Sequence, residues 1–210
     1  YSPFGSSAST DGAVSVGSTR RFSFNQNYLA RYETTFAQNH TINVMAGYEQ
    51  YKLTESSLSA YNDHLYSPFI PELGNAHGTS KKDLSSSSTY YMTQGIFGQL
   101  QYDYKETYFL SGSYRRDASS CFAPGHRWGN FGSVGAAWQI TKMDFMKDIK
   151  WINFLKLKLS YGIQGNDGVG YYTWADRYTA SYNEETGEYT LNMSQKGNEN
   201  LTWESSKSWN

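Results

Sequence analysis

Long runs in which apolar and polar residues alternate are the feature that most constrains how this chain folds. In residues 20–36 most even positions hold apolar or small residues and the odd positions are mostly polar, and residues 42–49 repeat the pattern after a short break at 37–40. Because successive side chains of a strand point to opposite faces of a sheet, a period of two indicates β-strands rather than helices. We therefore expect two long strands joined as a hairpin.

The alternation returns in the second half of the chain. Further strands are expected at residues 90–104, 108–115, 134–140 and 155–163, with a last strand beginning at Leu201. Short connections are expected at 105–107 and, with one helical turn, at 141–152. Residues 56–89, 115–133 and 164–200 show no strand period and are expected to be long loops. Connections that alternate between short and long are typical of outer-membrane barrels, which have short periplasmic turns and long extracellular loops.

The two faces of the expected strands favour the same architecture. Opposite the apolar face stand polar and charged residues: Arg31, Glu33, Glu49, Gln99, Gln101, Asp103, Arg115, Lys156 and Lys158. Strands of about ten residues, tilted by about 45°, cross an apolar band of about 25 Å. Aromatic residues near the strand ends suit the two interfaces of such a band: Tyr48, Tyr102, Tyr104, Tyr108, Tyr114, Trp128 and Trp138. We predict an all-β fold that is a fragment of a large antiparallel transmembrane β-barrel. A water-soluble β-sandwich, which also has one apolar and one polar face, is the alternative.

Composition argues against several other classes. The net charge is −1 over 210 residues, which gives no support for nucleic-acid binding. The single cysteine, Cys121, rules out an internal disulfide framework, and the four histidines have no metal-ligand spacing, so no metal or cofactor is expected. No run of about 18 apolar residues indicates a membrane helix, and the first residues do not have the pattern of a signal peptide. Because the final residues WESSKSWN stop within an alternating pattern, we expect a fragment of a longer protein.

Several ordered motifs in residues 90–210 resemble one protein family. The segment RRDASSCFAPGHRWGNFGS at 115–133, followed by SYGIQGN and NENLTWESS, is similar to the SusC/RagA-like TonB-linked outer-membrane proteins of Bacteroidota. The matching residues are Arg116, Asp117, Ser119, Ser120, Phe122, Pro124, Arg127, Trp128, Gly129, Phe131, Ser133, Ser160, Tyr161, Gly162, Gly165, Asn166, Leu201, Trp203 and Glu204. The departures from the family pattern are Ala118, Cys121, Ala123, Gly132 and Glu199, and none of them removes a strand.

The resemblance implies an importer in the outer membrane of Gram-negative bacteria. Its barrel, embedded in the lipid bilayer, is closed inside by an N-terminal plug and energised by TonB, and a SusD-like surface lipoprotein captures glycan or peptide oligomers. Residues 1–210 would supply only part of this barrel, without the plug or the segment that contacts TonB.

The loop motif at 115–133 has an expected structural role. Asp117 and the two serines of the motif favour a turn, because their side chains bond to nearby backbone groups. We expect Trp128 to anchor the returning strand, and Arg116, Asp117 and Arg127 to form an ionic network within the loop. Direct contact of these residues with substrate is the alternative.

Other functions are also considered. Tyr171, Tyr172, Trp174 and Tyr178 have side chains suited to stack on sugar rings, as in a soluble carbohydrate-binding module, although packing within their own loop is the simpler hypothesis. An iron-siderophore receptor of the same architecture is the nearest rival within the barrel class. No enzyme is expected and no catalytic residue is assigned, since the sequence holds no recognisable nucleophile motif and GNDGVG at 165–170 lacks the context of a phosphate-binding loop.

Overall fold

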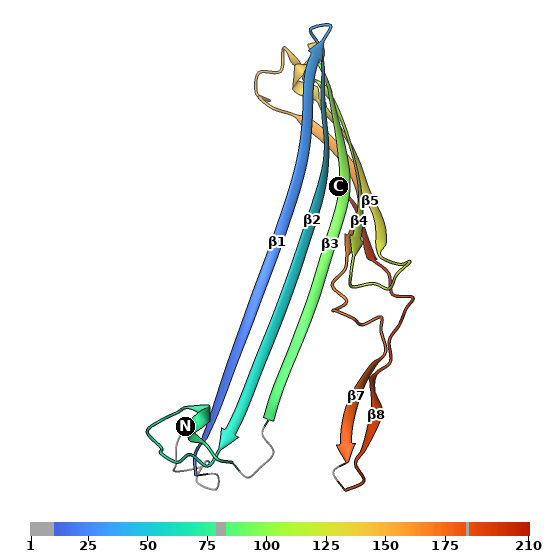
Figure 1. Ribbon diagram of the computed structural model, residues 1–210. Helices are drawn as coiled ribbons and strands as arrows, with labels where there is room; N and C mark the ends of the chain where they lie inside the picture. The colour runs from blue at the N-terminus through green and yellow to red at the C-terminus, as the bar shows by residue number, and fades with distance from the viewer. Residues whose placement is uncertain (1–10, 79–82, 184) are drawn as a thin grey trace. The chain divides into compact units, whose positions relative to one another are not determined.

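The fold is a sheet of antiparallel strands with a small separate hairpin. The computed structural model describes residues 11–78, 83–183 and 185–210. Within these residues one seven-stranded sheet has the order β1-β2-β3-β4-β5-β6-β9, and β7 pairs with β8 (Figure 1). The strands are β1 (Ala13–Phe36), β2 (His40–Asp63), β3 (Asp83–Tyr104), β4 (Tyr108–Ser119), β5 (Trp128–Gln139), β6 (Lys156–Asn166), β7 (Arg177–Asn183), β8 (Glu188–Gln195) and β9 (Glu204–Trp209).

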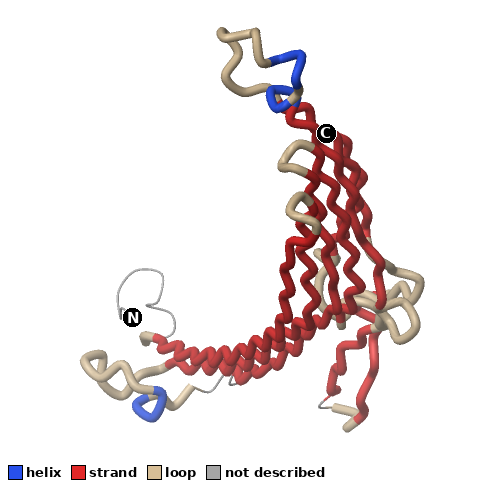
Figure 2. The backbone as a smooth tube through the Cα atoms, turned by 90° about the horizontal axis from the view of Figure 1, so that it is seen from above, coloured by secondary structure: helices blue, strands red, loops and turns tan. Residues whose placement is uncertain are grey.

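Among the described residues, helical structure is confined to short turns in the connections (Figure 2). These turns are η2 (Leu73–Asn75), η3 (Ile140–Lys142) and η4 (Asp144–Met146). In the part of the chain that the structure describes, no helix has the length and apolar character needed to cross a membrane. The connector between β5 and β6 thus contains two short helical turns, where the sequence predicted one.

Strands and tight turns between β3 and β6 follow the sequence prediction, whereas three predicted loops are wrong in part. β2 continues to Asp63 and β3 begins at Asp83, so much of the Ser-rich stretch 56–89 is strand. Only residues 120–127 of the motif lie outside β4 and β5, and the loop after β6 contains the β7–β8 hairpin. The physical reason is that a ladder needs only backbone N–H and C=O groups. Serines on both faces of a strand therefore conceal its period of two.

The chain forms two compact units, which are described separately. The first contains Tyr1–Phe24 and Leu53–Tyr90. Its buried apolar residues include Val14, Leu53 and Leu65. Gly12 has a φ of 84°, and a side chain there would lie 3.1 Å from Leu65. The Nδ2 atom of Asn62 donates a hydrogen bond of 3.0 Å to the Ala76 carbonyl, so this end of β2 is tied to the following loop.

The second unit, Asn25–Lys52 and Tyr91–Asn210, contains parts of β1, β2 and β3, the whole of β4, β5, β6 and β9, and the β7–β8 hairpin. Its register keeps polar and apolar side chains apart. Ser111 pairs with Gln101 and Gly135, whereas its neighbour Leu110 pairs with Tyr102 and Ala136. We call the side of Ser111 the polar face and the side of Leu110 the apolar face. The apolar face is uncovered within this chain: Leu100, Leu110, Val134, Leu157 and Leu159 are between 49% and 63% exposed.

Glycines on the polar face make room for large neighbouring side chains. A Cβ atom at Gly129 would lie 2.5 Å from Cζ of Phe131 and 2.9 Å from Cδ1 of Trp203. Gly112 of β4, by contrast, has no atom within 4 Å of the corresponding position. The two aromatic rings therefore occupy the space that any side chain at position 129 would need.

We predict that Gly129→Ala destabilises the full-length protein and that Gly112→Ala does not. Overpacking costs about 1–3 kcal/mol, because the two rings must shift. The midpoint of thermal unfolding in detergent micelles measures the difference, with Gly112→Ala as the matched control in a neighbouring strand. Equal midpoints for the two variants would show that the rings do not fix this position.

Candidate functional site

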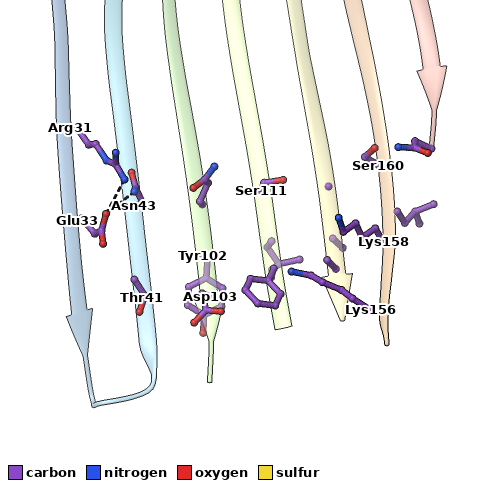
Figure 3. A pocket seen from close by; sticks show the side chains of 18 residues that line it. Arg31, Glu33, Thr41, Asn43, Tyr102, Asp103, Ser111, Lys156, Lys158 and Ser160 are labelled. Carbon is purple, nitrogen blue, oxygen red and sulfur yellow. Dashed lines mark hydrogen bonds and ion pairs between the residues drawn. The ribbon is translucent and has the colours of Figure 1, made fainter. Parts of the chain in front are cut away.

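A hollow of about 610 Å³ lies on the polar face of the second unit (Figure 3). Most of the charged and amide-bearing side chains that line it come from four strands: Arg31 and Glu33 from β1, Asn43 from β2, Gln101 and Asp103 from β3, and Lys156 and Lys158 from β6. The sequence predicted that these residues, apart from Asn43, share the polar side, and the structure places them around one concavity.

The two sides of the hollow differ in charge. On one side, Arg31 and Asn43 both bond to Oε2 of Glu33, at 3.0 and 2.9 Å. On the other, Nζ of Lys156 lies 3.5 Å from the centre of the Phe109 ring, which is a cation–π contact. Lys158 has no acidic partner among the described residues. The β6 side of the hollow is therefore positively charged.

Further along the polar face, one arginine connects two strands across a third. Arg115 of β4 donates from Nε to both carboxylate oxygens of Asp117 at 2.7 Å, and from Nη2 to Oε2 of Glu49 in β2 at 3.0 Å. The intervening strand β3 has Gly95 at this level, and the Asp117 carboxylate occupies the space that a side chain at Gly95 would take. The arrangement links β2 to β4 over β3.

The ionic network predicted for Arg116, Asp117 and Arg127 is wrong. Asp117 pairs with Arg115 instead, because residues two apart in a strand share a face whereas Arg116 points to the other side. The guanidinium of Arg116 lies 5.0 Å from the centre of the Trp128 ring. Nε of Arg127 donates to the carbonyl of Phe122 at 3.2 Å.

The last residue of β4 and the loop that follows it form a small buried core. Phe122 is fully buried and Ser119 is 1% exposed. The ring of Phe122 packs against Trp203 with 5.4 Å between the centres, and Nε1 of Trp203 donates to the Arg127 carbonyl at 2.8 Å. Pro124 is exposed at the loop surface. This burial favours the structural role of the motif over direct contact with substrate.

Two hydroxyl groups hold this loop to other segments through one carboxylate. Oγ of Ser119 and the Tyr91 hydroxyl both donate to Oδ2 of Asp167, at 2.6 and 2.8 Å. Ser120 exchanges two further bonds with the Met92 backbone, one from its N–H and one to its Oγ. Burial raises the pKa of Tyr91, and the bond to Asp167 raises it further, so the hydroxyl stays a donor.

Sequence reasoning missed Tyr91 and Asp167 as members of the site. Asp167 lies 48 residues beyond Ser119 and 76 beyond Tyr91, so no local spacing connects them. The signal that was present is the position of Asp167 directly after the end of β6, where a loop carboxylate can turn toward the neighbouring strands.

The four aromatic residues predicted to stack on a ligand do not share one element. Tyr171 packs against Tyr91, with ring centres 5.3 Å apart. Tyr178 lies in β7, pairs with Met193 and is 55% exposed. Tyr172 has a left-handed φ of 59° between these positions, and Trp174 has a buried Nε1 with no hydrogen-bond partner in the described chain. A role of these residues in ligand stacking stays a prediction.

A series of ring contacts marks one end of the apolar face. It runs across five strands through Phe36, His40, Tyr104, Tyr108 and Trp138, with centre-to-centre distances between 4.7 and 6.4 Å. On β5, Trp138 and Trp128 lie roughly 33 Å apart at about 3.3 Å per residue. With a strand tilt of about 45°, their separation across a bilayer is about 23 Å, close to the height of a barrel's apolar band.

An open sheet with an apolar exterior, a polar interior and aromatic residues at the limits of the apolar band is typical of a segment of an outer-membrane β-barrel wall. Comparison with known proteins identifies the class. A TonB-dependent receptor of Formosa agariphila is 30% identical over 186 residues, which cover 86% of this chain. The TonB-dependent receptor SusC of Bacteroides thetaiotaomicron is 30% identical over 141 residues, or 64% of this chain. The chain spans 17% and 14% of the length of these two relatives.

Solved structures agree with the sequence comparisons. The structure of the RagAB peptide transporter matches 93% of this chain with a TM-score of 0.86 and 25% identity, and the chain covers 22% of that structure's chain. No protein-family model matches the sequence. The resemblance to SusC/RagA-like TonB-dependent receptors is confirmed, and this chain corresponds to a stretch of their barrel.

The buried loop core can be tested through Cys121. This thiol is 3% exposed, and burial raises its pKa above the usual value, an effect that a bond with Ser119 opposes and the Asp167 carboxylate reinforces. We expect slow reaction with maleimide at pH 7.5, and a rate that rises at higher pH than for a free thiol because only the thiolate reacts. Phe122→Ala should accelerate labelling by at least roughly tenfold, since it leaves a cavity beside the thiol.

Mass spectrometry of the labelled peptide measures this rate in the full-length protein. His126→Ala is the matched control, because His126 is an exposed residue of the same loop. Equal labelling of the wild type and Phe122→Ala would contradict a loop held closed by the Phe122 side chain.

Proposed function

We propose that this chain is part of the barrel wall of a TonB-dependent importer in the outer membrane of a Gram-negative bacterium. The observation that carries the proposal is the sheet itself, which exposes Leu110, Val134 and Leu159 on one face and gathers Arg31, Asp103 and Lys158 on the other. In water this arrangement would leave the apolar face uncovered, whereas lipid covers it without cost. The likeness to TonB-dependent receptors supports the same conclusion.

The polar face then lines the interior of the barrel. There it would meet the plug and, during import, the cargo. The proposal gives the chain a role in transport and no catalytic step. Energy from TonB would enter through the plug side of the parent protein rather than through these strands.

We propose an oligomeric cargo, a peptide or a glycan, that a SusD-like lipoprotein presents at the cell surface. The support is the likeness to a RagAB structure described as a peptide transporter and to the receptor SusC. The positively charged side of the hollow, at Lys156 and Lys158, suits the carboxylates that both peptides and acidic glycans carry.

The orientation of the wall gives a first test. We expect a cysteine at Thr186, in the turn between β7 and β8, to react with a membrane-impermeant maleimide on intact cells, because that turn lies on the extracellular side. A cysteine at Lys147, in the connector between β5 and β6, should react only after the outer membrane is permeabilised. Both residues are exposed, so access to the reagent decides the result.

Labelled peptides of the full-length protein are counted by mass spectrometry. The reverse pattern would overturn the orientation. Labelling of both sites on intact cells, with the protein found in the soluble fraction, would overturn the membrane proposal itself.

Cargo is tested by uptake. Cells that lack the parent gene should lose accumulation of fluorescent peptides or of oligosaccharides, and the gene should restore it only in cells with a working TonB. Ferric siderophore uptake is the control. If it alone depends on the gene, the oligomer proposal is wrong and an iron receptor takes its place.

A further inference from the structure

The two charges at paired positions on the apolar face of β3–β6 and β9 are both positive. The paired positions of β3–β6 and β9 on that face hold Arg116 and Lys207 and no acidic residue. The polar face of the same strands carries both signs, as Asp103, Asp117 and Arg115 show. A face that contacts lipid tails excludes charge, so the two exceptions need a reason.

Arg116 sits where the apolar band ends. It pairs with Ile96 and Asn130 near the loop end of β4, which closes at Ser119. Its guanidinium lies 5.0 Å from the centre of the Trp128 ring, and it has no acidic partner among the described residues. The Tyr114 hydroxyl, two residues before Arg116 in β4, donates to Oδ1 of Asn130 at 2.7 Å. Because Asn130 is the β5 partner of Arg116, the polar contacts on this face begin at the level of Arg116.

Lys207 occupies the same face on β9. It pairs with Ile163, and two residues further the rings of Trp209 and Tyr161 lie 4.3 Å apart on the apolar face. Lys207 is exposed and forms no ion pair among the described residues. Arg116, and Ile163 as the partner of Lys207, thus lie in the halves of β4 and β6 that are nearer the loops following these strands.

We propose that Arg116, held against Trp128, binds the phosphate of a lipid in the outer leaflet, and that Lys207 contributes a second contact on the same face. The inference rests on the proposed function, because it needs this face to meet the membrane. A guanidinium in a cation–π contact with an indole can still donate from its N–H groups, and a guanidinium fork matches a phosphate in a bidentate way. The apolar residues beside it on the face, such as Ile96 and Val134, accommodate the acyl chains.

An acidic protein partner is the competing occupant. It would have to displace lipid from a face that continues without a break into the apolar stripe of Leu110 and Leu100. In a lipid that carries a phosphate, the phosphate would bind Arg116 and the acyl chains of the same molecule would cover Leu110 and Leu100. Basic residues at a membrane surface attract such lipids. The observations therefore favour lipid.

The test uses the full-length protein purified in detergent and incubated with monophosphoryl lipid A. Native mass spectrometry measures the fraction of protein that retains the lipid. We expect Arg116→Gln to lower the apparent affinity about fivefold, the effect of one basic residue at a membrane surface, and Lys207→Gln to lower it less. Arg177→Gln is the matched control, because it makes the same substitution at an exposed arginine of the β7–β8 hairpin.

Two further probes identify what is bound. The same lipid without its phosphate should bind equally weakly to the wild type and Arg116→Gln, and inorganic phosphate should not compete at millimolar concentration. Equal retention of the lipid by Arg116→Gln and Arg177→Gln would overturn the inference. So would competition by inorganic phosphate, which would indicate a simple anion site. Absence of the protein from the outer-membrane fraction would instead overturn the proposed function, so the two failures are distinguishable.

Discussion

The register of the backbone ladder from β3 to β9 is the constraint on which the other features depend. Its pairs run without a shift through β4, β5 and β6, so paired residues share a face from strand to strand and successive residues of a strand alternate between the faces. A slip of one residue would exchange the faces and place Arg115 in lipid. The same ladder pairs the backbone groups internally, which is the condition for a strand to cross a bilayer. The register thus determines which side chains would face lipid, and an apolar environment on one face in turn favours this register over a shifted one.

The sequence predicted those strands in which apolar and polar residues alternate with a period of two. The strands around Leu110 and Leu159 and the turn at 105–107 were predictable, because apolar and polar residues alternate there and a tight turn separates the strands. The ends of β2 and β3 were not, since serines on both faces hide the period. The loop motif was recognised from its residues, but the residues that contact it from other segments were not predicted. Asp167 and Trp203 reach the loop only because β6 pairs with β5 and β9 pairs with β6, and that is information about pairing rather than about local sequence.

The distribution of buried residues follows from the same environment. A water-soluble sheet would place its core under the apolar face, yet here Leu157 and Leu159 are exposed while Phe122 and Cys121 are buried in the loop after β4. Among the described residues of the second unit, hydrophobic burial is therefore concentrated at the end of β4 and in the loop that follows it. In the proposed membrane setting, lipid would take the place of a core along the strands. The buried loop residues cover the ends of β4 and β5, where backbone groups leave the ladder.

Glycines on the polar face leave room for large side chains of neighbouring residues. Gly47 lies under the Phe97 ring, Gly95 under the Asp117 carboxylate and Gly129 under the Phe131 ring, and in each case a Cβ atom would meet the covering group. Large side chains can therefore lie along the sheet instead of projecting from it. The Arg115 bonds to Glu49 and Asp117 are partly exposed and contribute about 0–1 kcal/mol each, so their main effect is to hold these side chains flat. A wall built in this way stays polar without narrowing the passage that a cargo would need.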